Sequence, residues 1–186
     1  MIGTNFDTGL TSAAEVFVDR RNGALEGHRQ LFVPQREPRL VLVDAASSRM
    51  RLYRHGRLQA QFTVGLGPGP AAARLPGSQS RLRGMYFVVE RDERRLAINY
   101  PNRYDALRAR RSGLLSHCDE ADVRGAWQAR RPTPGDTPLG GGVAITAGLD
   151  ASGRHATSPP GRILMRDRDL VHVLRQIPAR AMVVIF

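Results

Sequence analysis

The stretch RLVLVDAASSRMRLYRHGRLQAQFTVGLG, residues 39–67, decides the fold. It contains short runs with the apolar alternation or β-rich composition of strands, at residues 39–44, 49–54 and 58–64. A turn-forming stretch separates the first two runs, and His55-Gly56 is typical of a tight hairpin turn between the second and third. Neighbouring strands joined by such short turns predict an antiparallel sheet.

Outward from this stretch, further strands are predicted at residues 85–90, 96–99, 143–146 and 181–186, the last being apolar enough to lie in the centre of a sheet. One helix is predicted from the cap Asn102 to Gly113. A second opens at Asp167 or Asp169 and stops at Pro178, and its apolar residues share one face. The sequence therefore predicts a mostly β domain with short helices.

The remaining segments are predicted to be irregular. Residues 1–38 have the composition of an N-terminal arm and linker, with a short helix at Thr11–Arg20, and residues 39–186 form the domain. Within the domain, residues 114–141 are predicted to be an irregular insertion, and the glycine-rich residues 65–70 a loop. A phosphate cradle is disfavoured there because no Lys-Ser/Thr pair and no helix follow.

The composition limits the functions to be considered. All 28 basic residues are Arg, and the formal net charge is +11, but the arginines are scattered, which favours a solvated surface over a nucleic-acid interface. The single cysteine excludes an intrachain disulfide, and the five histidines lack metal-ligand spacing, so neither a metal site nor a cofactor is predicted. No apolar run long enough for a transmembrane helix occurs, and residues 1–30 lack the pattern of a secretory signal, which leaves the localisation open.

The order of these segments resembles the L,D-transpeptidase (YkuD) catalytic domain, a mostly β sandwich of bacterial cell-wall enzymes. Four segments carry the resemblance: residues 39–67, GMYFVV at 84–89, INYPNRYDA at 98–106, similar to the Tyr-Pro-Asn segment of one branch of the family, and GRILMRDRDLVHVLRQIPARAMVVIF at 161–186. The resemblance implies an L,D-transpeptidase-like β-sandwich and a relation to enzymes that cross-link peptidoglycan stem peptides through a cysteine acyl-enzyme.

The catalytic motifs of that family are degenerate here. The family's Ile-His-Gly strand end corresponds to Ile145-Thr146-Ala147-Gly148, so that Ala147 stands where the histidine is expected. Its Ser/Thr-x-Gly-Cys-Ile motif corresponds to residues 158–163, in which Ser158 and Gly161 fit but Arg162 replaces the cysteine. Arginine stays protonated and alanine accepts no proton, so this comparison predicts the loss of the family's thiol chemistry.

Three hypotheses follow. The first is a non-catalytic peptidoglycan-binding module, in which Arg162 holds a stem-peptide carboxylate, with Tyr100 and Asn102 as further ligand-binding candidates. The second is an active cysteine transpeptidase or carboxypeptidase with a relocated nucleophile, Cys118, and with His117 or His155 as its base. The third is an Arg-rich nucleic-acid-binding protein, which predicts strongly salt-dependent affinity.

Overall fold

The computed structural model of the chain describes residues 17–18, 25–26, 38–67, 82–154 and 159–186. Its strands and helices are β1 (Phe17–Val18), β2 (Leu25–Glu26), β3 (Arg39–Asp44), β4 (Arg49–Arg54), β5 (Arg57–Thr63), β6 (Gly65–Leu66), β7 (Gly84–Arg91), β8 (Arg95–Ile98), α1 (Arg103–Arg111), α2 (His117–Gln128), β9 (Ala144–Ala147), β10 (Arg162–Met165), α3 (Asp167–Gln176) and β11 (Met182–Ile185).

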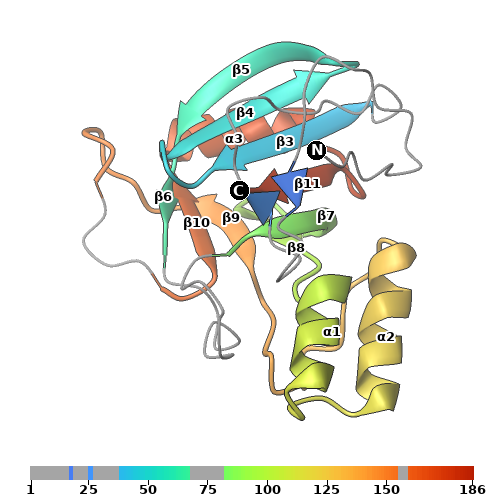
Figure 1. The fold of residues 1–186 in the computed structure, drawn as a ribbon. Helices are drawn as coiled ribbons and strands as arrows, with labels where there is room; N and C mark the ends of the chain where they lie inside the picture. The colour runs from blue at the N-terminus through green and yellow to red at the C-terminus, as the bar shows by residue number, and fades with distance from the viewer. Residues whose placement is uncertain (1–16, 19–24, 27–37, 68–81, 155–158) are drawn as a thin grey trace.

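One nine-stranded sheet, in the order β5-β4-β3-β11-β7-β8-β9-β10-β6, forms the body of the domain. It curls over, with α3 packed on it, while α1 and α2 form a helical hairpin at the opposite end of the molecule from β4 and β5 (Figure 1). β1 and β2 pair separately as a two-stranded sheet. The mostly β fold class with short helices that the sequence predicts is therefore confirmed.

The strands predicted in residues 39–67 form in the predicted antiparallel order. β3 pairs with β4, and β4 pairs with β5, with one register shift next to Leu52. His55 and Gly56 both have positive φ, as a two-residue hairpin turn requires. Successive residues of β3 point to opposite faces, so that Val41 and Leu42 enter different apolar clusters on the two sides of the sheet.

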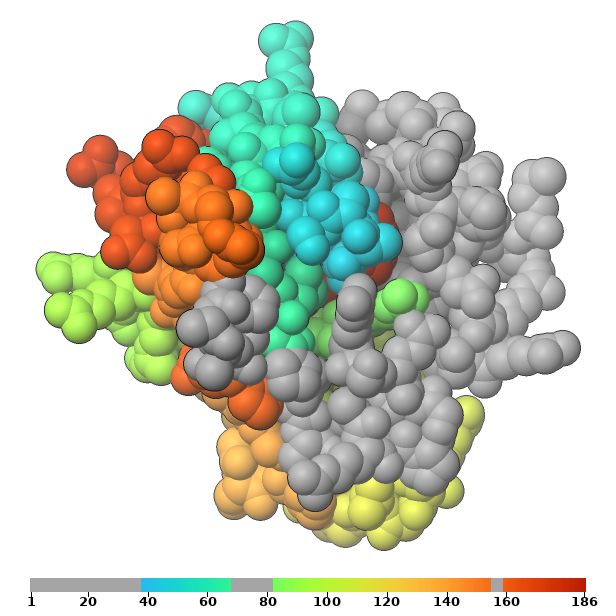
Figure 2. Space-filling model, turned by 90° about the vertical axis from the view of Figure 1, so that its left-hand side faces the viewer, coloured from blue at the N-terminus to red at the C-terminus, as the bar shows by residue number. Residues whose placement is uncertain are grey.

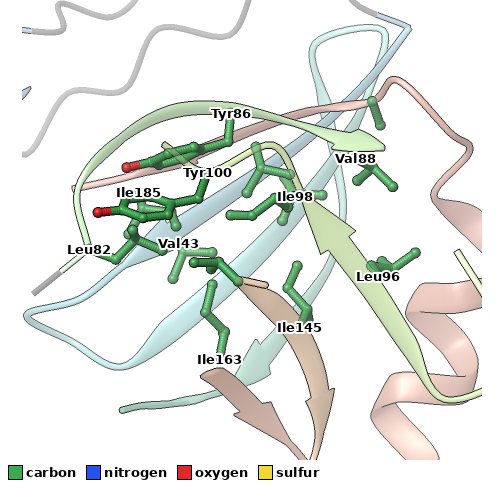
Figure 3. Close-up of a cluster of buried hydrophobic side chains, with 14 of the residues drawn as sticks. Val43, Leu82, Tyr86, Val88, Leu96, Ile98, Tyr100, Ile145, Ile163 and Ile185 are labelled. Carbon is green, nitrogen blue, oxygen red and sulfur yellow. The ribbon is translucent and has the colours of Figure 1, made fainter. Parts of the chain in front are cut away.

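The main core lies inside the curled sheet. Strands from both halves of the sheet contribute to it, with Val43 and Ile185 on one side and Ile145 and Ile163 on the other (Figure 3). The buried stripe of α3 closes it, through Leu170, Val173, Leu174 and the following Ile177. This arrangement fixes β8, β9 and β10 with one face toward the core and the other face outward.

A smaller apolar cluster lies on the opposite side of β3, β11 and β7. Its buried members are Leu40, Leu42, Phe87, Trp127, Met182 and Val184. Trp127, at the end of α2, donates a hydrogen bond of 2.9 Å from Nε1 to the carbonyl of Met85 in β7. The helical hairpin is therefore attached to the sheet through this indole.

Three segments differ from the prediction. Residues 114–141 are not irregular throughout, because α2 begins after Ser116, whose side chain forms a capping box with Asp119. Gly65–Leu66 is not loop but the short strand β6, which pairs with β10, itself a strand that the sequence did not predict. The helix expected at Thr11–Arg20 lies mostly outside the described residues, and the two residues of it that are described form β1.

None of the helices in the described ranges is long and apolar enough to cross a membrane. No group of three or more His, Cys, Asp or Glu side chains in the same ranges is arranged to hold a metal ion.

Candidate functional site

Residues from the two segments that the sequence comparison aligned with family motifs border one surface hollow. We call it the β9–β10 hollow; it has a volume of about 770 Å³ and is lined by Asp92, Glu93, Arg94, Arg95, Thr146, Ala147, Gly148, Pro159, Arg162 and Leu164. The β7–β8 turn forms one rim and projects at the left edge of Figure 2, in light green, next to the orange residues that follow β9. The hollow thus brings together Ala147, Gly148 and Arg162, which lie apart in the sequence.

The floor of the hollow is the outward face of β8, β9 and β10. β9 and β10 run parallel, with Arg162 beside Ala144 and Leu164 beside Thr146, and Arg95 of β8 lies opposite Thr146 on the other side. Neighbours in register share a face, so these side chains point away from the core that Ile145 and Ile163 enter.

Ala147 lies in the wall of the hollow, but its side chain packs against the main core. Thr146 shares the outward face of the sheet with Arg162 and with Ala144, which lies directly beside Arg162, although the comparison of motifs singled out Ala147. The period-two pattern around the buried Ile145 is the signal that could have identified Thr146. Gly148 has φ of +150°, and a Cβ there would overlap the side chain of Leu164, so glycine is required at this edge of the hollow.

Arg162 begins β10, and its backbone is held from two sides. Its amide donates to the carbonyl of Pro159 at 3.3 Å, and its carbonyl accepts from the amide of Gly67 at 2.9 Å. Its half-buried side chain forms no ion pair with any of the described residues. A guanidinium on a fixed backbone, without a partner in the described part of the chain, can hold an incoming carboxylate through two hydrogen bonds.

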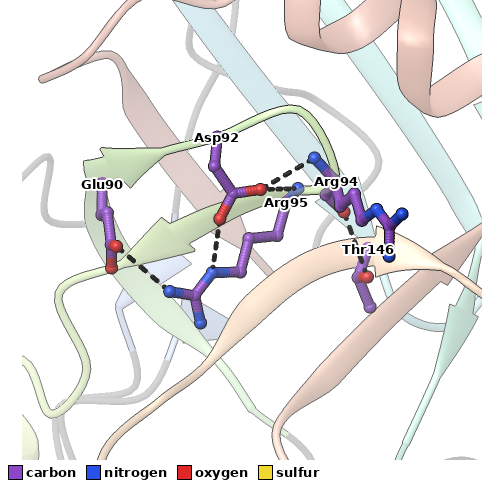
Figure 4. Close-up of polar contacts among 5 residues, drawn as sticks. All are labelled: Glu90, Asp92, Arg94, Arg95 and Thr146. Carbon is purple, nitrogen blue, oxygen red and sulfur yellow. Dashed lines mark hydrogen bonds and ion pairs between the residues drawn. The ribbon is translucent and has the colours of Figure 1, made fainter.

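The rim formed by the β7–β8 turn is internally satisfied. Asp92 Oδ1 accepts from the amides of Arg94 and Arg95 at 2.7 and 3.0 Å, and its Oδ2 accepts from Arg95 Nε at 2.9 Å (Figure 4). The Arg94 amide is the main cause that lowers the pKa of Asp92, with the Arg95 side chain adding to it. Arg95 also pairs with Glu90 at 3.1 Å, and Thr146 Oγ1 donates to the Arg94 carbonyl at 3.3 Å. Asp92 and Arg95 therefore direct most of their hydrogen bonds within the turn itself.

The described lining of the hollow offers charged and apolar side chains to a ligand. The described residues that line the hollow include neither cysteine nor histidine. Their one hydroxyl, on Thr146, is already donated to a backbone carbonyl. His155 and Ser158 lie outside the described residues.

The candidate nucleophile Cys118 lies on another part of the molecule. Cys118 and His117 lie in the first turn of α2, where both are exposed. The short loop between α1 and α2 forms the tip of the helical hairpin that extends away from the sheet (Figure 1). Neither residue lines the β9–β10 hollow.

Tyr100 and Asn102 are buried rather than presented to a ligand. Asn102 caps α1, because its Oδ1 accepts from the amides of Tyr104 and Asp105 at 2.8 and 3.0 Å, while the Asp105 carboxylate accepts from the Asn102 amide at 3.1 Å. The Tyr100 ring lies in the main core, 6.2 Å from the ring of Tyr86. These side chains have structural partners and do not reach the hollow.

Around this cap lies a network that we call the α1 capping cluster, made of Tyr86, Asn102, Asp105 and Arg108. Tyr86 Oη contacts Asp105 Oδ2 at 3.5 Å, and Arg108 pairs with Asp105 Oδ1 at 3.0 Å. Burial raises the pKa of Asp105, although its hydrogen bonds from the Asn102 amide and from Arg108 act in the opposite direction. Burial and the nearby Asp105 charge raise the pKa of Tyr86.

Comparison with known proteins adds a likeness of fold. No protein-family model matches the sequence. No curated protein matches it either. Among solved structures, Bdellovibrio bacteriovorus Bd1075 aligns over 95% of this chain and 53% of its own, with 15% identity and a TM-score of 0.51.

Two further structures that align with the chain are L,D-transpeptidases. The one from Mycobacterium smegmatis covers 80% of this chain and 58% of its own, with 10% identity and a TM-score of 0.45. A mutant from Enterococcus faecium covers 84% of this chain and 56% of its own, with 11% identity and a TM-score of 0.46. At these identities the likeness is one of fold, and of the three only the Bdellovibrio structure exceeds a TM-score of 0.5. The chain spans little more than half the length of each.

Proposed function

We infer that this chain is a non-catalytic relative of the L,D-transpeptidase domain that binds carboxylate-bearing stem peptides of peptidoglycan. The observation that carries the proposal is the β9–β10 hollow, which Arg162 lines. In the comparison of motifs, this arginine stands where the family has its nucleophile. A guanidinium at this position is a cation where the family has a thiolate. It attracts carboxylates but cannot form an acyl-enzyme. The order of strands and motifs in the sequence supports the relation to peptidoglycan.

The proposal assigns a role to each part of the hollow. Arg162 holds the carboxylate, and the Asp92–Arg95 pair keeps the β7–β8 rim rigid. Leu164 and Ala147 provide apolar floor and wall for the aliphatic parts of a peptide. Arg94 and Glu93, exposed on the rim, supply both charge signs to a ligand that carries both.

The test is binding of the purified chain to isolated sacculi and to a tetrapeptide-stem muropeptide, together with mass spectrometry of the intact protein. We expect saturable binding without an acyl adduct and without new products. Arg162→Ala should weaken binding tenfold or more, since a hydrogen bond to a charged group contributes about 1.5–3 kcal/mol. Arg162→Lys should recover part of the loss, because it restores the charge but not the fork.

Arg168→Ala is the matched control, because this arginine lies on α3 with its side chain 75% exposed and outside the hollow. Its binding should equal that of the unchanged chain. An acyl adduct that disappears in Cys118→Ser would instead support the cysteine enzyme. Binding that Arg162→Ala and Arg168→Ala weaken equally would refute the assignment of the carboxylate to Arg162.

A further inference from the structure

The tip of the β4–β5 hairpin carries two kinds of cross-strand pair side by side. Arg54 lies opposite Arg57, and in the next pair Tyr53 lies opposite Leu58. Successive residues of a strand point to opposite faces, so the arginine pair is on one face of the ribbon and the apolar pair on the other. The tight His55-Gly56 turn holds both pairs at the very end of the hairpin.

The basic face extends to a third strand. Arg39 of β3 lies opposite Arg54, so that Arg39, Arg54 and Arg57 form a row across neighbouring strands spaced about 4.8 Å apart. Like charges directly opposite one another are destabilising. None of these arginines forms an ion pair with a residue in the described ranges, and Arg54 and Arg57 are exposed. The row therefore fits a partner that brings negative charge.

The apolar face of the hairpin tip, with Tyr53 and Leu58, favours one class of anionic partner over another. Leu58 is 53% exposed, more than any other large hydrophobic side chain in the described part of the chain. Tyr53 is half-buried and packs against the apolar cluster that contains Leu40. A soluble polyanion gains nothing from an exposed leucine. A lipid interface accommodates tyrosine and leucine while its anionic headgroups attract arginine.

The tip of the α1–α2 hairpin provides a comparison within the same molecule. Leu114 there is 46% exposed, so an exposed leucine is present at both tips. The arginines differ, because Arg110 pairs with the buried Glu120 at 3.5 Å. The two tips lie at opposite ends of the molecule, with β4 and β5 at the top and the helical hairpin at the bottom of both Figure 1 and Figure 2.

We propose that the tip of the β4–β5 hairpin docks on an anionic phospholipid membrane. Arg54 and Arg57 contact headgroup phosphates, Leu58 enters the interface, and Tyr53 lies at its edge. The arginine pair and the apolar pair are on opposite faces of one ribbon, so both reach the surface only when the hairpin approaches end-on. This docking surface is separate from the β9–β10 hollow and does not depend on its ligand.

The test is sedimentation of the purified full chain with vesicles of equal parts phosphatidylglycerol and phosphatidylcholine. We expect binding that is absent with phosphatidylcholine alone and weaker at about 0.5 M than at about 0.1 M salt. Arg54→Gln with Arg57→Gln should lower the partition coefficient about 30-fold, since each arginine near an anionic surface is worth about fivefold. Leu58→Ala should lower it roughly fivefold.

Two controls separate the hairpin from the overall charge. Arg111→Gln with Arg131→Gln removes the same charge from exposed sites elsewhere, and Leu114→Ala removes the other exposed leucine. Both should bind within about twofold of the unchanged chain. Arg54→Lys with Arg57→Lys should retain most of the binding, and circular dichroism should show that every variant is folded at the temperature of the assay.

Three outcomes would overturn the proposal. The first is no binding to the anionic vesicles. The second is an equal loss in the hairpin and control arginine variants, which would assign the binding to net charge. The third is binding to polythymidylate as strong as to vesicles, with no effect of Leu58→Ala in either assay, which would assign the row of arginines to a soluble phosphodiester polymer.

Discussion

The α1 capping cluster and the β9–β10 hollow both contain polar and charged residues, but these are buried and hydrogen-bonded in the cluster and accessible in the hollow. In the cluster, Asn102 and Asp105 are 1% and 6% exposed, and each accepts hydrogen bonds from the backbone of the other. In the hollow, Arg162 lies on an open surface without an ion pair in the described part of the chain. Both regions contributed ligand-binding candidates to the sequence prediction. The Asn102 and Asp105 side chains are already used by the backbone of α1, whereas the Arg162 guanidinium is available to a ligand.

The largest expected effect tests how tightly the cluster is packed. Gly84 has φ of +136°, and a Cβ there would overlap the side-chain amide of Asn102. Gly84→Ala should therefore lower the free energy of unfolding by about 3 kcal/mol, through backbone strain and displacement of the cap. Urea denaturation measures this change.

Gly125→Ala is the matched control, because this glycine lies within α2 and a Cβ there would meet no atom within 4 Å. This change should stabilise the protein by up to about 1 kcal/mol, since alanine has the higher helix propensity. If both substitutions had the same small effect, the capping cluster would not be the closely packed region that the comparison requires.

The next pair of substitutions separates the two regions, because one should change only stability and the other only affinity. Asn102→Ala should cost about 1–2 kcal/mol of stability, because α1 loses its cap, while affinity for the muropeptide stays unchanged. Arg162→Ala should change stability by less than about 0.5 kcal/mol while lowering that affinity. The measurements are urea denaturation and muropeptide titration of both variants. If Asn102→Ala lowered the affinity for the muropeptide under conditions where the variant is folded, Asn102 would be part of the ligand site.

The smallest expected effect is the dependence of folding stability on pH. A rise in pH lowers the contribution of Asp105 in the capping cluster and increases that of Asp92 at the hollow. Burial raises the folded-state pKa of Asp105 above its ordinary 3.8, so the folded protein retains a proton that the unfolded chain releases. The contribution of Asp105 to stability therefore falls as the pH rises from about 3.8 through this raised pKa. Hydrogen bonds lower the pKa of Asp92, so its contribution is present above the ordinary value of 3.8 and is lost as the pH falls through the lowered pKa.

Unfolding in urea from about pH 3 to about pH 7 measures both contributions. Asp105→Asn should remove the fall in stability that occurs as the pH rises above about 3.8. Asp92→Asn should remove the weaker fall in stability that occurs as the pH drops below about 3.8. The same slope in both variants would contradict the difference in environment between the two carboxylates.

Much of the fold could be predicted because local patterns and tertiary packing agree. In β4 the alternation of apolar residues matches the two faces of the sheet, and the continuous apolar run of β3 matches a strand that is buried on both faces. In α3 the apolar stripe matches the buried face. α2 was missed because its flanking glycines and prolines dominate the composition of residues 114–141. Its signals were the capping box Ser116–Asp119 and the spacing of Val123, Ala126 and Trp127.

The site was harder to predict because a motif fixes positions along the chain but not the direction of side chains. Ala147 and Arg162 border one hollow, although they lie apart in the sequence. Which neighbour in β9 faces Arg162 depends on the register between β9 and β10, and that register is a tertiary property. Tyr100 and Asn102 are predicted ligand-binding residues for a similar reason. The sequence does not reveal that the Asn102 side chain already accepts a hydrogen bond from the backbone of α1.

The position of β11 in the sheet has a consequence for biosynthesis. β11 lies between β3 and β7, parallel to the first and antiparallel to the second, and its residues 182–185 follow all other strands in the sequence. A ribosome makes both halves of the sheet before it makes the strand that joins them. Until then β3 and β7 each expose an unpaired edge to the surrounding cell, and the nascent chain depends on this late, four-residue segment to close its sheet.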